Sequence, residues 1–136
     1  MKCKQLVMAG SLVLAAQGVV ADTALDNSKP LVCAATQVVE CTPTGECDRG
    51  TPETFNLPVL FQIDIASKVV ESARAGGNKR VSVISEVTEA GDVTVLQGVD
   101  EADGWSSTVN RSTGQMTVVS AADGLGYVVF GTCANL

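Results

Sequence analysis

The sequence contains no histidine, and this absence removes a large part of common catalytic and metal-binding chemistry. Ser-His-Asp and Cys-His catalysis both require an imidazole base, and most catalytic zinc sites require imidazole ligands. The glycine-rich patterns of nucleophile elbows, P-loops and dinucleotide sites are missing as well. The remaining Asp, Glu, Lys and Tyr residues show no paired arrangement, so we expect no enzymatic activity and no cofactor.

Positive charge is scarce. Nine Lys and Arg residues face fifteen Asp and Glu residues, which gives a formal net charge of −6 and a pI of about 4.4. An acidic surface repels phosphate backbones and anionic lipid headgroups, so nucleic acid and membrane surfaces are disfavoured as partners. If a protein partner exists, its surface is expected to be basic.

Long hydrophobic runs are confined to the N-terminus. Lys2 and Lys4 precede an uncharged, mostly apolar segment of about 15 residues, which is shorter than the ~20 residues of a membrane span. Small and β-branched residues then lead to Ala21. This is the pattern of a secretory signal peptide, so we expect cleavage after residue 21 and a single mature domain over residues 22–136. Losing Lys2 and Lys4 takes two positive charges from the net charge of −6 and gives −8.

The cysteines agree with export to the periplasm or the medium. Besides Cys3, the chain has Cys33, Cys41, Cys47 and Cys133, an even set typical of disulfides in an oxidising compartment. A turn-forming segment with Pro and Gly separates Cys41 from Cys47, and the other two cysteines lie at opposite ends of the domain. We predict the pairs Cys41–Cys47 and Cys33–Cys133. A four-thiolate zinc site is the competing interpretation, but the spacing is unlike paired CxxC motifs.

Helical periodicity is also missing after the N-terminal run. Instead, short runs rich in Val, Ile and Thr alternate with Gly, Asn and Asp clusters, while 48–57 has the composition of an irregular loop. The pattern predicts an all-β domain, a small antiparallel up-and-down meander of about eight strands that closes into a barrel, with a β-sandwich as the alternative. The predicted strands are 31–41, 59–65, 68–74, 81–87, 93–99, 105–109, 116–118 and 127–133.

One cluster is a candidate interaction site. Asp100, Glu101 and Asp103 lie within four consecutive positions and are followed by Trp105. Three carboxylates can bind Ca²⁺, but their spacing differs from that of an EF-hand loop, and one turn cannot place two carboxylates on opposite sides of a glycosidic bond. A solvated hairpin tip is the simpler interpretation. Aromatic residues make up only 4% of the chain, so Trp105 is expected to serve packing before binding.

Two functions fit these features. The first is a binding or inhibitor-type module, expected to be monomeric, whose acidic surface loops contact a basic extracytoplasmic protein. In predicted architecture the chain resembles the small periplasmic lysozyme-inhibitor barrels, although it lacks their motif residues, and the resemblance implies a basic protein target. The alternative is a small-ligand or ion carrier of lipocalin-like architecture. An eight-stranded barrel either is filled by side chains or holds one small ligand, and Val81, Val93, Val95 and Val118 are candidates for filling it.

Overall fold

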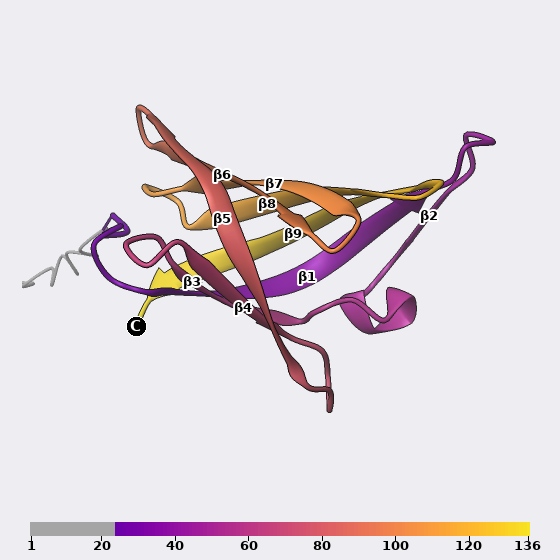
Figure 1. Ribbon diagram of the computed structural model, residues 1–136, viewed down its shortest axis with the longest axis horizontal. Coiled ribbons are helices and arrows are strands. Elements are labelled where there is room, and N and C mark those ends of the chain that lie inside the picture. Colours follow the sequence, from indigo (N-terminus) through magenta and orange to yellow (C-terminus); the bar gives the residue numbers. More distant parts are fainter. Residues whose placement is uncertain (1–23) are drawn as a thin grey trace, which may run out of the picture.

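The computed structural model describes residues 24–136, and β-strands make up most of this part of the chain (Figure 1). The predicted signal peptide, residues 1–21, lies outside the described residues. The elements in chain order are β1 (Leu31–Cys41), β2 (Cys47–Gly50), the 3-10 helix η1 (Pro52–Phe55), β3 (Leu60–Asp64), β4 (Val69–Ala73), β5 (Lys79–Ala90), β6 (Val93–Asp100), β7 (Asp103–Asn110), β8 (Gln115–Ala122) and β9 (Leu125–Asn135).

The sheet closes on itself because the first and last long strands pair. From β3 to β9 each strand is antiparallel to the next, and β1 pairs with β3 through Leu31–Ala34 and with β9 along most of its length. Eight strands therefore form a closed barrel, and β2 is an additional strand on the far end of β1. This confirms the predicted barrel and excludes the sandwich. The segment 48–57 is more regular than predicted, since it contains part of β2 and all of η1.

Both predicted disulfides are confirmed, and each joins residues that lie directly opposite each other in an antiparallel ladder. Cys33 on β1 is bonded to Cys133 on β9 at the seam where the barrel closes. Cys41 and Cys47 are bonded across the hairpin between β1 and β2. The first bond closes the barrel covalently, and the second fixes the short additional strand to its edge.

Strand β5 changes partner along its length. Its first half, Lys79–Val83, pairs with β4, and its second half pairs with β6 from Ile84 onward. A register shift between Ile84 and Glu86 marks a β-bulge, which bends the strand and allows it to turn from one neighbour to the other. Backbone pairing between β5 and β6 therefore ends at Ile84 and Gly98, and the ends of the two strands beyond that point are joined by side chains only.

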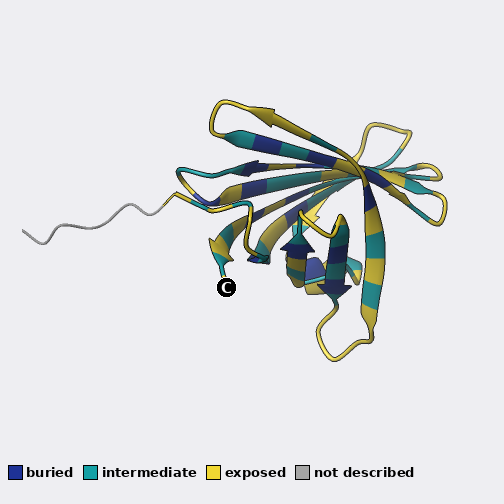
Figure 2. Ribbon diagram, turned by 60° about the vertical axis from the view of Figure 1, so that its left-hand side comes forward, coloured by how far each residue is buried: buried dark blue, intermediate teal, exposed yellow. Residues whose placement is uncertain are grey.

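Three of the four valines that were predicted to fill the barrel lie on its outer face. Ile84, Leu96, Val109 and Met116 are fully or almost fully buried, and along most strands more buried and more exposed residues alternate (Figure 2). The prediction that Val81 fills the interior is wrong, since 60% of its surface is exposed.

The same alternation also corrects two further assignments on β6. Thr94 and Leu96 are fully buried, which places their neighbours Val93 and Val95 on the outer face. Val118 does face inward, as predicted, and packs against the core.

Residues 24–30, called the N-terminal segment below, pack against one end of the barrel. Leu25 contacts the core cluster, and its backbone N–H donates to the carbonyl of Arg111 at 2.7 Å. The amide Nδ2 of Asn27 donates to Oγ1 of the buried Thr94 at 2.8 Å, and Nδ2 of Asn135 donates to the carbonyl of Asp26 at 2.9 Å. These contacts cover the end of the barrel where β1 begins and β9 ends.

Candidate functional site

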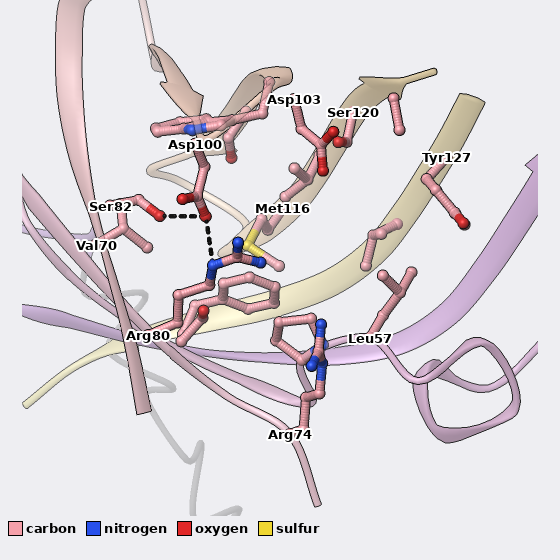
Figure 3. A pocket seen from close by; sticks show the side chains of 18 of the residues that line it. Leu57, Val70, Arg74, Arg80, Ser82, Asp100, Asp103, Met116, Ser120 and Tyr127 are labelled. Atoms are coloured by element: carbon pink, nitrogen blue, oxygen red, sulfur yellow. Dashed lines mark hydrogen bonds and ion pairs between the residues drawn. The ribbon is translucent and has the colours of Figure 1, made fainter. Parts of the chain in front are cut away.

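The barrel encloses a cavity of about 330 Å³ that opens at the end opposite residues 24–30. Figure 3 shows side chains that line it. The mouth is formed by the loop after η1 together with the ends of β4 and β6 and the beginnings of β5, β7 and β9. The volume lies at the lower end of the range for small-molecule sites, ~300–1,000 Å³. The interior is therefore partly hollow, which answers a question that the sequence leaves open.

The inner part of the cavity is apolar. Its wall is made by side chains from five different strands, so it belongs to the barrel itself. Several of them are almost completely buried. The main contributors are Ile63, Val70, Leu96, Met116, Val118 and Val129. Such a surface gains free energy when an apolar ligand displaces water from it.

The mouth of the cavity is polar and contains an ion pair. Nε of Arg80 on β5 lies 2.9 Å from Oδ2 of Asp100 at the end of β6, and the hydroxyl of Ser82 donates to the same oxygen at 2.9 Å (Figure 3). Nη2 of Arg80 also lies 3.1 Å from the carboxylate of the exposed Glu101. These contacts connect β5 to β6 where their backbones are no longer paired. Arg80 and Asp100 thus hold the wall of the mouth in place.

Further charged side chains surround the opening. Arg74, just after β4, and Asp103, at the start of β7, both line the cavity, on opposite sides of the view in Figure 3. Within residues 24–136, neither of them takes part in an ion pair. The mouth therefore offers both a cationic and an anionic group to a ligand.

Tyr127 lines the cavity near the start of β9. Burial raises the pKa of its phenol above the ordinary value of 10.0, and the carboxylates of Glu40 and Asp103 raise it further. Each of these effects disfavours the negatively charged phenolate. At neutral pH the hydroxyl is protonated and can donate a hydrogen bond at the mouth.

Two polar atoms in the wall have no partner. The indole Nε1 of Trp105 and the hydroxyl of Ser107 are buried and make no hydrogen bond within the described chain. The two residues are separated by one position on β7, and both side chains belong to the cavity wall. Buried polar groups are almost always paired, because leaving one unpaired costs about 1–3 kcal/mol.

The structure separates the predicted acidic cluster. Glu101 is exposed at the tip of the β6–β7 hairpin, with a φ of 56° that belongs to the left-handed region. Asp100, Asp103 and Trp105 instead line the cavity. In the part of the chain that the structure describes, no three Cys, Asp or Glu side chains come close enough to hold a metal ion. The cluster is thus mainly the rim of a cavity.

Sequence reasoning missed the other polar residues of the cavity. The sequence does not indicate that these residues form a group, because they lie far apart in the chain, on or beside β4, β5, β7 and β9: Arg74, Arg80, Ser82, Ser107 and Tyr127. A local signal was present: Arg80 and Ser82 alternate with Val81 and Val83, and the polar pair faces inward. Polar residues on the inner face of a barrel are typical of a binding cavity.

The two disulfides indicate an oxidising, extracytoplasmic environment. Among residues 24–136, no helix has the length and apolar character to cross a membrane. Comparison with known proteins found no matching family model, no similar curated protein and no similar solved structure.

Proposed function

We propose that this protein binds a small amphipathic ligand inside its barrel and carries it outside the cytoplasm, in the periplasm or the surrounding medium. The observation that supports this best is the cavity of about 330 Å³, with an apolar inner wall and a polar mouth. A barrel that acted only through its loops would gain stability by filling this space, because voids in a core cost free energy. An open cavity with a fixed rim therefore favours the carrier over the surface module.

The distribution of polarity favours one orientation of the ligand. Its apolar part would contact Ile63, Leu96 and Met116, and its polar part would remain near Arg74 and Asp103 at the mouth. Binding would then remove apolar surface from water without burying an unpaired charge. Export through the predicted signal peptide is part of this proposal, since cleavage after Ala21 would retain the segment that closes the other end.

Inhibition of a basic protein through the acidic turns remains a separate prediction. Asp100 is directed to Arg80 and Ser82, and Asp103 lines the cavity, so the turn presents less free acidic surface than its sequence indicates. This observation favours the carrier. It does not bear on other loops.

A pair of variants on β8 tests the proposal. Ala122 lines the cavity near its mouth, whereas its neighbour Ala121 is exposed on the outer face. Ala122→Trp should occupy the mouth and abolish binding of an environment-sensitive apolar dye such as anilinonaphthalene sulfonate. Ala121→Trp adds the same group outside and should bind the dye as the native protein does.

Native mass spectrometry of the protein secreted from an exporting host gives a second measurement. We expect extra mass that survives gentle ionisation and is lost on denaturation, and Ala122→Trp should not carry it. Equal dye binding in the two variants, together with a bare native mass, would contradict the carrier. A pull-down for a basic extracytoplasmic partner would then be the next measurement.

A further inference from the structure

We infer that the ligand carries a cationic group of the ammonium type, which binds between Asp103 and Tyr127 at the mouth of the cavity. This inference rests on the proposed function, since it defines the head group of the molecule that the cavity holds. It is based on the arrangement of charges around the opening. Carboxylates without a cation lie on the side formed by β7, β9 and β1, whereas the arginines lie on the side of β4 and β5.

The cavity has room for a head group between Asp103 and Tyr127. Asp103 on β7 and Tyr127 on β9 both line the cavity, and β8 lies between these two strands. Two strand spacings, about 10 Å, separate the backbones of β7 and β9. Near the mouth β8 contributes only the small side chains of Ser120 and Ala122 to the cavity wall. A compact group can therefore contact the carboxylate on one side and the phenol ring on the other.

Acidic side chains continue beyond Tyr127 in the same row of the sheet. Tyr127 lies directly opposite Ser120 on β8 and Glu40 on β1. Glu40 in turn lies directly opposite Asp48 on β2. Directly opposite residues of an antiparallel ladder share one face of the sheet. The proposed position of the head group therefore has the carboxylate of Asp103 on one side and this acidic row on the other.

The arginines of the mouth do not neutralise these carboxylates. Arg80 is already paired with two other carboxylates, at the end of β6 and in the turn that follows. Arg74 lies across the opening from Asp103 in Figure 3. Within residues 24–136, neither Asp103 nor Glu40 takes part in an ion pair. A ligand carboxylate would be repelled here, whereas an ammonium group would be attracted.

The environment of Tyr127 agrees with this polarity. Burial and the carboxylates of Glu40 and Asp103 raise the pKa of its phenol, so a negative charge is disfavoured at this point of the cavity. Burial disfavours a charge of either sign, but the two carboxylates stabilise a cation. An aromatic ring also attracts a cation that lies over its face.

The test compares three probes with the same octyl or octanoyl chain: octyltrimethylammonium, 1-octanol and octanoate. Titration calorimetry measures the Kd of each. We expect octyltrimethylammonium to bind at least about fivefold more tightly than octanoate at low ionic strength. Added salt should weaken the binding of octyltrimethylammonium, because it screens the carboxylates, and should not weaken the binding of 1-octanol.

A pair of variants locates the head group. Asp103→Asn keeps the size of the side chain and removes its charge. It should weaken octyltrimethylammonium binding roughly threefold to fivefold, the effect of a partly exposed ion pair, and leave 1-octanol binding unchanged. Asp123→Asn is the matched control, because Asp123 is exposed in the turn between β8 and β9 and does not line the cavity. It should change neither Kd.

The methyl protons of octyltrimethylammonium give an independent measurement. An aromatic ring moves the proton resonance of a group over its face upfield, so this signal should move upfield in the complex with the native protein. The movement should be smaller in Tyr127→Leu. Tyr127→Phe keeps the ring and should retain it.

The outcomes separate the two proposals. If none of the three probes binds, the proposed function fails and the inference fails with it. If 1-octanol binds, and octanoate binds as tightly as octyltrimethylammonium or more tightly, the cavity is a binding site and the cationic head group is overturned. Equal weakening by Asp103→Asn and Asp123→Asn would also overturn it, because the cation would then respond to the net charge of the protein.

Discussion

Gly98 and Trp105 face each other across the β6–β7 ladder, and the indole ring occupies the space that a side chain at position 98 would need. A β-carbon at Gly98 would also lie 2.6 Å from the carbonyl oxygen of Val83 on β5. Both neighbours belong to the wall of the cavity or to the strand that bends beside it. Packing at this glycine therefore links the shape of the barrel to the position of Trp105.

Gly98→Ala tests this relationship. We expect a loss of about 1–3 kcal/mol in the free energy of unfolding, the usual cost of overpacking a closely packed site. The fluorescence of Trp105 should shift to longer wavelength as the ring is displaced toward the mouth. Urea titration followed by this fluorescence measures both effects.

Gly104→Ala is the matched control for Gly98→Ala. Gly104 is the second residue of the neighbouring strand β7, and a β-carbon there would meet nothing within 4 Å. Its free energy of unfolding should change by less than about 0.5 kcal/mol, as is usual for exposed sites. Equal effects of the two substitutions would contradict the steric role of Gly98.

The two disulfides should differ in their contribution to stability. The bond Cys33–Cys133 closes a loop with a sequence separation of 100, and Cys41–Cys47 closes one with a separation of 6. In the chain-entropy model the long loop contributes about 4.7 kcal/mol and the short one about 2 kcal/mol. Replacing both cysteines of the long loop by serine should therefore lower the Tm further than replacing both cysteines of the hairpin.

Calorimetry of the two double-serine proteins measures this difference and avoids free thiols. If removing Cys33–Cys133 leaves the Tm unchanged, the seam between β1 and β9 is held by its ladder alone. The covalent closure of the barrel would then have no thermodynamic role.

The pH dependence should show the environment of Tyr127. Its pKa is raised in the folded protein, first by burial and then by Glu40. The folded state therefore keeps the phenolic proton more tightly than the unfolded state. The contribution of this proton to the stability of the folded state is fully present below the ordinary tyrosine pKa of about 10. It is lost as the pH rises through the pKa that Tyr127 has in the folded protein. We expect the free energy of unfolding to fall over this alkaline range, and to fall less in Tyr127→Phe.

Tyr127 is the single tyrosine of the chain, so its ionisation can be followed directly by ultraviolet absorbance. Glu40→Gln removes a carboxylate that disfavours the phenolate and should lower the titration midpoint. Glu86→Gln, on the exposed part of β5, should not move it. A midpoint in the native protein at or below that of a free tyrosine would contradict the assigned environment.

Much of the fold follows from local sequence features. Strand positions follow from Val-rich runs between Gly, Asn and Asp turns, and the run predicted at 31–41 coincides with β1. The cysteine pairing follows because one pair flanks a turn and the other lies at the chain ends that a closed barrel brings together. Each of these inferences depends on neighbouring residues or on closure, and neither requires knowledge of which face is buried.

The facing of the strands could not be predicted in the same way. The period-2 pattern of 80–83 shows two faces, and the rule that apolar residues face inward selects Val81 and Val83. In the barrel Arg80 and Ser82 face the cavity, and the two valines are exposed. The rule assumes a filled interior, and a polar mouth reverses it. The bulge after Ile84 then restores Val87 to the core side, which a regular alternation cannot represent.

The end of the barrel opposite the cavity depends on a hydrogen bond between Asn27 and Thr94. Thr94 is fully buried, and its Oγ1 accepts from Nδ2 of Asn27 at 2.8 Å, while the same amide donates to Glu89 at 2.7 Å. Asn27→Ala should leave a buried hydroxyl unpaired and lower the free energy of unfolding by about 1–3 kcal/mol.

Thr94→Val keeps the shape of the side chain and removes the hydroxyl, so the double variant should lose less stability than the sum of the two single losses. A double-mutant cycle by urea unfolding should give a coupling of about 0.5–1.5 kcal/mol. Strict additivity would mean that the N-terminal segment covers this end through the packing of Leu25 alone.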